Sequence, residues 1–370
     1  MRRALSAVLT LGLTAAAVLA FVGWAPDARP QPAAAPAPAG RLTLPPPRAG
    51  HARPLVVILA DNAATETTDF VAPYAVLKES GAADVVSVSM RPGPVRLQMA
   101  LTVLADETAA EFDAAHPEGD DLVIVPYLPK ADAAALGPWL RRQYGRGATV
   151  MSICAGAENL AKAGLLDGKR AATHWHFVDR LARTYPRTTW VRDRRYVQDG
   201  RIITTTGVSA SIPAALAIVE AIGGRGLATA TAARLGAPDW GPGHHTADFP
   251  FDAGDMTRAA LNIASVWDHE RLEAPVAAGF DELGLALAAD AWSSTFRASV
   301  VTTSPVAGPV RSRRGLLLVP DARPTAHGPR LPRHPGPAVA QLDLALADIT
   351  ARYGAGSSTV AAKGLEYPRR

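Results

Sequence analysis

The stretch from Gly147 to Ala161 reads GATVMSICAGAENLA and decides the fold. The residues before Cys154 are apolar and β-branched, as in a buried strand, whereas those after it are small and favour a helix. The pattern predicts a strand, a sharp turn and a helix with the thiol at the apex, a nucleophile elbow. Gly156 gives this turn room, and the helix N-terminus beyond the thiol favours a thiolate.

Strand and helix patterns alternate on both sides of this elbow. Leu55 to Ala60 (LVVILA) is a continuous apolar run, typical of a parallel strand that is buried on both faces. The other expected elements are strands at 85–90, 101–104, 122–126, 147–153, 195–197 and 202–206, and helices at 69–80, 109–115, 131–144, 175–185 and 207–222. Their order predicts an α/β fold with a doubly wound parallel sheet.

The composition limits the classes of protein that fit. A hydrophobic content of 48% supports a large core, and the net charge of +4 comes from dispersed basic residues, so we expect no nucleic-acid partner. Cys154 is the single cysteine, which excludes an intramolecular disulfide and a multi-cysteine metal site. His244, His245, Asp248 and His269 could be metal ligands, but adjacent histidines point apart and the segment GPGHHTADFPF looks like a loop, so we expect neither a metal nor another cofactor.

The N-terminus predicts export. Met1-Arg2-Arg3 precedes an uncharged apolar stretch that ends at Ala25, long enough for a transmembrane helix or a signal peptide. The arginines favour an N-terminus held inside, with the rest outside the cytoplasm at the cell membrane, or secreted if the stretch is cleaved. Residues 26–52 are rich in Pro and Ala and predict an extended linker.

Two segments resemble a known family. SICAGAENLAKAGLLDGKRAATHW at 152–175 and ITTTGVSASIPAALAIVE at 203–220 look like the ThiJ/PfpI family, which has the flavodoxin-like, class I glutamine amidotransferase-like fold. The resemblance is greatest to the sensor-like domains that precede the DNA-binding domain of AraC-type regulators, and no such DNA-binding domain follows here. Asp69 to Pro73 fits the family's early acid, four residues before a proline.

The resemblance implies a set of site residues. Cys154 would be the nucleophile, Asp69 an acid that hydrogen-bonds it, and His174 the nearby imidazole. Backbone N–H groups of Ala155 and Gly156 would serve as an oxyanion hole. Alternatives stay open: Glu66 could replace Asp69, and His176 could replace His174. One departure weakens acyl transfer, because Tyr127-Leu128-Pro129 stands where the family has glycines.

The second half carries an internal repeat. Gly93-Pro94-Val95-Arg96 recurs as Gly308-Pro309-Val310-Arg311, and residues 276–321 correspond to 61–106 at an offset of 215. We expect a partial βαβ repeat without an elbow, followed by a helix at 338–353. The predicted domains are a signal peptide or anchor at 1–25, a linker at 26–52, the ThiJ/PfpI-like domain at 53–225, a connecting segment at 226–275, the partial repeat at 276–354 and a loose tail at 355–370.

The functional expectation has two branches. In the first, Cys154 acts on or binds a small carbonyl-type electrophile, since the resembled family includes hydrolases, hydratases, glyoxalase-like enzymes and redox-responsive proteins. In the second, the domain is a non-catalytic sensor or binding domain derived from an AraC-type regulator that lost its DNA-binding half. The expected partners are a small-molecule ligand, the membrane through the N-terminal segment, and a second copy in a homodimer, as family members often dimerise.

Overall fold

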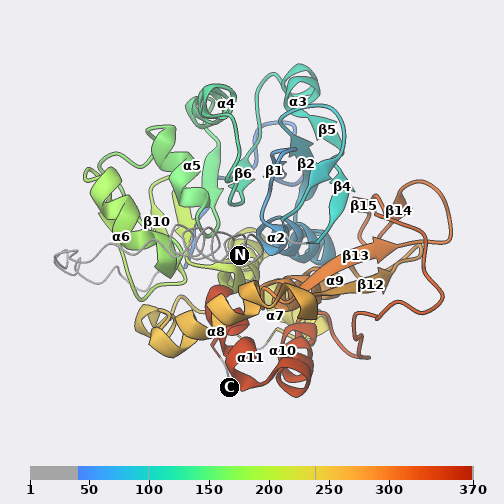
Figure 1. Cartoon of the computed structure of the whole chain (residues 1–370). Helices are drawn as coiled ribbons and strands as arrows, with labels where there is room; N and C mark the ends of the chain where they lie inside the picture. Colours follow the sequence, from blue (N-terminus) through green and yellow to red (C-terminus); the bar gives the residue numbers. More distant parts are fainter. Residues whose placement is uncertain (1–40, 99, 238, 369–370) are drawn as a thin grey trace.

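The computed structural model describes residues 41–98, 100–237 and 239–368, so the predicted anchor or signal peptide lies outside the described residues. A seven-stranded sheet in the order β10-β11-β7-β6-β1-β2-β5 forms the centre, and only β10 runs antiparallel to its neighbour (Figure 1). Its strands are β1 (Leu55–Ala60), β2 (Asp84–Ser89), β5 (Glu107–Thr108), β6 (Leu122–Val125), β7 (Thr149–Ser152), β10 (Tyr196–Asp199) and β11 (Ile202–Thr205). The predicted α/β fold with a mostly parallel sheet is confirmed.

Helices cover both faces of this sheet. Alternate residues of β1 point to opposite sides, so that Ile58 joins one core cluster and Val57 the other. On the side of Ile58 lie α2 (Thr67–Ser80) and α7 (Ser211–Leu235), and on the side of Val57 lie α3 (Ala109–Ala115), α4 (Ala133–Gly145), α5 (Gly156–Lys162) and α6 (Trp175–Thr184). The pair β8 (Arg170–Ala171) and β9 (Thr189–Trp190) forms a separate small sheet.

Helix α7 is a core helix with a break. The segment Val208–Leu235 is the one described stretch long and apolar enough to cross a membrane. However, this helix packs closely along α2, and its inner side chains, such as Leu216 and Ile218, are fully buried. Gly224, with φ 80°, interrupts it, so the Gly223-Gly224 pair marks a kink after which the helix resumes.

The second half is built as a partial copy of the first. Strand β12 (Glu270–Pro275) corresponds to β1, α9 (Glu282–Ser293) to α2, β13 (Ala298–Thr303) to β2, β14 (Val310–Arg311) to β3 (Val95–Arg96), and β15 (Leu317–Leu318) to β4 (Thr102–Leu104). Even a hydrogen-bond pattern recurs at the offset of 215. Ser87 donates from N and Oγ to Asp106 at 2.9 and 2.7 Å, and Thr302 donates from N and Oγ1 to Asp321 at 2.9 and 2.8 Å.

The two copies meet about an approximate two-fold axis. Strand β15 pairs antiparallel with β4, giving the sheet β14-β15-β4-β3, and Leu318 is opposite Val103, its own counterpart. Helix α9 packs on α2 in the same way, helix on counterpart (Figure 1). The copy therefore covers the first domain instead of forming a full sheet alone.

Two predicted boundaries are corrected. The copy begins at Glu270, because β12 repeats β1, and the supposed connecting segment 226–275 contains the end of α7, α8 (Ala253–Ala264) and β12. The predicted helix at 338–353 is present as α10 (Ala340–Tyr353). The expected loose tail is wrong through residue 368, since α11 (Ala355–Gly364) packs on α8 and α10. Its small residues, such as Ala361, are buried but give little periodic signal in sequence.

Candidate active site at Cys154

The elbow has the predicted geometry. Strand β7 ends at Ser152 and α5 begins at Gly156, and Cys154 between them has φ 56°. This left-handed backbone is strained for a residue with a side chain and is typical of functional sites. A Cβ on Gly156 would lie 2.5 Å from the Val125 carbonyl oxygen, so only glycine lets α5 start this close to β6.

Two carboxyl groups, the half-buried Glu66 and the fully buried Asp69, lie near the Cys154 thiol. Glu66 caps α2 by accepting from the Asp69 N–H at 2.5 Å, and Asp69 accepts from the Tyr127 N–H at 3.1 Å, with its Oδ1 3.4 Å from Ser211 Oγ. Both Glu66 and Asp69 therefore belong to the site. Burial raises the pKa of Asp69 to about 7, although the Tyr127 hydrogen bond opposes this rise.

A third carboxyl comes from the copied half. Asp290 of α9 accepts from the Thr68 N–H at 3.0 Å and from the Thr68 hydroxyl, beside Glu66. Burial, followed by the neighbouring carboxyls, raises the pKa of both Asp290 and Glu66 well above the ordinary range. Such closely spaced acids titrate together, and their surroundings favour the protonated forms of Glu66 and Asp290.

The thiol is closed off and protonated. Cys154 is 4% exposed. Burial raises the pKa of its thiol well above the ordinary value, Asp69, Glu66 and Glu366 add to the rise, and the Ala155 N–H opposes it. Desolvation and three nearby acids thus oppose the thiolate that the helix N-terminus favours.

His174 is close to the elbow, but both of its ring nitrogens are already hydrogen-bonded. It caps α6, and its Nδ1 accepts from the His176 N–H at 3.2 Å. Its Nε2 lies 3.0 Å from the Gly364 carbonyl oxygen, which can only accept, so Nε2 carries the proton and the ring is neutral. Burial lowers the pKa of His174, which agrees with this assignment. Neither ring nitrogen has a lone pair directed at the thiol.

Most of the backbone donors expected for an oxyanion hole are already used. Besides the Tyr127 N–H, the Leu128 N–H donates to Asn159 Oδ1 at 3.2 Å, and the Gly156 N–H donates to the Ile153 carbonyl at 2.8 Å. The structure thus gives Gly156 a steric role. The Ala155 N–H, which lies against the Cys154 sulfur, is the remaining one of the two predicted donors.

Sequence reasoning missed the C-terminal part of the site. Glu366 is 1% exposed and accepts from the Gly207 N–H at 2.5 Å and from His244 Nε2 at 2.8 Å. His244 was considered only as a metal ligand, and no group suited to a metal occurs among residues 41–98, 100–237 and 239–368. No motif surrounds Glu366, so only its burial reveals it.

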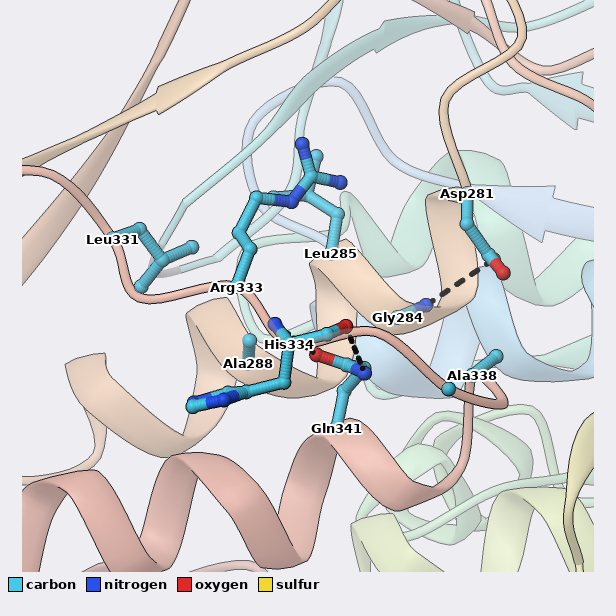
Figure 2. A pocket seen from close by; sticks show the side chains of 10 residues that line it. Asp281, Gly284, Leu285, Ala288, Leu331, Arg333, His334, Ala338 and Gln341 are labelled. Carbon is cyan, nitrogen blue, oxygen red and sulfur yellow. Dashed lines mark hydrogen bonds between the residues drawn. The ribbon is translucent and has the colours of Figure 1, made fainter.

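The copied half has a small cleft at the equivalent place. At the offset of 215, Asp281 corresponds to Glu66 and Gly284 to Asp69, and both line a cleft of about 90 Å³ between α9 and α10. Figure 2 shows Asp281 accepting from the Gly284 N–H, with Arg333, His334 and Gln341 on the other side. The copy ends before any elbow, so this cleft has the remains of the acid pair and no thiol.

Comparisons with known proteins agree with the first half of the chain. The model of the DJ-1/PfpI family matches residues 54–221. The HTH-type transcriptional regulator CdhR of Pseudomonas aeruginosa is 35% identical over 138 residues, 37% of this chain and 40% of the regulator. Isonitrile hydratase of Pseudomonas putida is 35% identical over 115 residues, 28% of this chain and 46% of the hydratase. A protein encoded in the cpoL 5' region of Streptomyces lividans is 41% identical over 102 residues, 27% of this chain and 70% of that protein.

Solved structures match over the same part. Drosophila melanogaster DJ-1beta aligns with a TM-score of 0.45 and 22% identity, covering 50% of this chain and 99% of that one. An AraC family transcriptional regulator from Pseudomonas putida aligns with a TM-score of 0.42 and 19% identity, covering 48% and 97%. The chain thus spans less than half of the CdhR regulator and of isonitrile hydratase, whereas about half of this chain matches each of these solved structures almost whole.

Proposed function

The chain belongs to the DJ-1/PfpI family through residues 54–221, and from this premise we propose that Cys154 adds to small, uncharged carbonyl-type compounds with Asp69 as the proton carrier. The observation that carries this proposal is the pairing of a thiol on a strained elbow with a carboxyl whose pKa is about 7. A group with that pKa both gives and takes a proton near neutral pH, as acid–base catalysis requires.

The reaction is an addition in which atoms and electrons balance. A bond forms between sulfur and the carbonyl carbon, the C=O π pair moves to oxygen, and the oxygen takes a proton from Asp69. The thiol proton passes to the Asp69 carboxylate, so the net change is addition of S–H across C=O. No oxidant or reductant is needed. A neutral substrate suits the site, because a second negative charge beside three acids would be repelled.

Similarity to isonitrile hydratase supports a small electrophile as the substrate class. The limited set of free N–H donors argues against hydrolysis of esters or amides, since tetrahedral acyl intermediates need at least two good donors. Addition to an aldehyde places less charge on oxygen when Asp69 protonates it during attack. A site made of a thiol and an acid therefore favours reversible adducts over acyl transfer.

The test is adduct formation by intact-protein mass spectrometry. The full-length chain would be incubated with a panel of small aldehydes and α-oxoaldehydes, and adducts at Cys154 that add the mass of one intact carbonyl compound would be measured under non-denaturing conditions. We expect an adduct in the wild type, none in Cys154→Ser, and a slower one in Asp69→Asn. Ser152→Ala, on the same strand, is the matched control and should behave as the wild type. If Cys154→Ser gives the same adducts and the same turnover, the proposal fails.

A second candidate function is that of a sensor domain that binds a ligand without turnover. It is favoured by the backbone N–H donors that are already hydrogen-bonded and by the likeness to the CdhR regulator. It predicts saturable stabilisation by a ligand that persists in Cys154→Ser. Turnover that depends on Cys154 would contradict it.

Export remains part of the proposal, and it rests on the basic residues Arg2 and Arg3 before an apolar stretch. It is tested by fractionation of expressing cells: the chain should resist carbonate extraction if anchored, or appear shortened outside the cell if cleaved. A full-length protein in the cytoplasmic fraction would contradict both forms.

A further inference from the structure

A C-terminal segment lies across the loops that carry the Cys154 site. We call residues 363–366 the C-terminal strap. Three successive carbonyl oxygens of this strap accept hydrogen bonds from the site: Lys363 from Trp175 Nε1 at 2.9 Å, Gly364 from His174 Nε2 at 3.0 Å, and Leu365 from the Ser209 N–H at 3.0 Å. These bonds join residues more than 150 positions apart in sequence, so the contact is purely tertiary.

Glu366 anchors the strap. Its carboxylate accepts from the Gly207 N–H at 2.5 Å and from His244 Nε2 at 2.8 Å, and its carbonyl accepts from the Ser209 hydroxyl at 2.6 Å. Its backbone has φ 53°, a conformation that side-chain-bearing residues rarely adopt, so these contacts hold it there against strain. Glu366 and His174 together fill the space that a Cβ on Gly207 would need.

The strap controls what His174 can do. While Gly364 accepts from Nε2 and His176 donates to Nδ1, the imidazole can neither take the thiol proton nor stabilise a thiolate. The strap also brings the Glu366 charge to the thiol, which already faces Asp69 and Glu66. The groups facing His174 are Glu366 and His244, and Tyr127 is a further neighbour of the thiol.

We propose that Glu366 is a positioning residue of the Cys154 site, and that the strap it anchors must move before His174 can act on the thiol. Once Gly364 no longer accepts from Nε2, the ring can carry its proton on Nδ1 in place of the His176 contact, and Nε2 can then take the thiol proton. The inference rests on the proposed function, since it concerns the same thiol. Its test does not use carbonyl compounds, so failure of the carbonyl assay and failure of the strap are distinguishable. In the closed state the site is assembled but idle, and release of residues 363–366 exposes both thiol and imidazole.

The experiment measures alkylation of the single cysteine by iodoacetamide in the full-length chain. Glu366→Gln loses one acceptor and the charge, and Glu366→Gly loses the anchor but relieves the strained backbone, so the latter folds without the φ penalty. We expect both variants to be alkylated at least tenfold faster than the wild type at pH 8, with the pH–rate profile displaced to lower pH. The matched control is Glu282→Gln, which removes an equally buried glutamate charge that is paired with Arg314 at the start of α9.

A second substitution separates a specific role of His174 from a general loosening of the structure around the thiol. His174→Gln retains an N–H donor for the Gly364 carbonyl but cannot act as a base. We expect it to remove most of the gain in alkylation rate that Glu366→Gly produces. Wild-type rates in both Glu366 variants would overturn the proposal, as would an equal gain in Glu282→Gln or a Glu366→Gly rate that is insensitive to His174→Gln.

Discussion

Replacing Asp69 with asparagine should make the protein more stable at neutral pH and change the way its stability depends on pH. Asp69 is fully buried, and its pKa is raised from 3.8 to about 7. Between these two values the folded chain binds a proton that the unfolded chain has released. The contribution of this residue to stability is therefore fully present below pH 3.8 and lost as the pH rises to about 7.

The size of the effect follows from the same pKa values. A rise from 3.8 to about 7 corresponds to about 4 kcal/mol of unfolding free energy lost across that window. Asparagine keeps the local hydrogen bonds, because its Oδ1 accepts from the Tyr127 N–H and its amide can donate to Ser211 Oγ, whose proton goes to the Val208 carbonyl at 2.6 Å. The neutral side chain is then insensitive to pH.

The assay is urea unfolding of the wild type and Asp69→Asn at intervals between pH 4 and pH 8. We expect similar stabilities at pH 4 and an advantage for the variant that grows to about 4 kcal/mol at pH 8. The Asp69 charge also raises the pKa of Glu66, so its removal lowers that pKa and adds to the advantage of the variant at neutral pH. A difference that stays constant over this range would refute the assignment of Asp69 as a buried acid that is protonated near neutral pH.

Three further substitutions and one control test the packing of the site and of the two halves. Gly156→Ala should destabilise the protein by about 2 kcal/mol or more, since the new Cβ meets the Val125 carbonyl, and chemical denaturation measures this. Trp292 on α9 is fully buried, so Trp292→Ala should lower the unfolding free energy by about 4 kcal/mol. The variant should still unfold in one transition when followed by circular dichroism. Two separated transitions would show that the halves fold independently. Leu318→Asp buries a charge at the axis where β15 meets β4, and it should lower the unfolding free energy by about 3 kcal/mol. Leu317 is half-exposed, so Leu317→Asp should lower it less. Equal losses of stability for the two variants in thermal melts would contradict the burial of Leu318 at this axis.

The fold could be predicted because its signals are local. A buried parallel strand such as β1 is a continuous apolar run, and the elbow is a strand followed by small residues around Cys154, so each is visible within a short window. The repeat was also visible, since Gly93-Pro94-Val95-Arg96 recurs at a fixed offset. What the sequence alone could not give was where the copy begins, because β12 (ERLEAP) shares almost no letters with β1.

The site, like the fold, was predictable from the sequence only in part. Sequence alone determined that a thiol stands at a strand-to-helix apex with an early acid, Asp69, and a nearby imidazole, His174. Only the tertiary structure decided that Asp290 joins the acids from the copied half and that Glu366 closes the site from the C-terminus. It also decided the protonation of these groups. The physical reason is that desolvation and hydrogen-bond saturation depend on what packs around a group, and here much of that packing comes from residues more than 150 positions away.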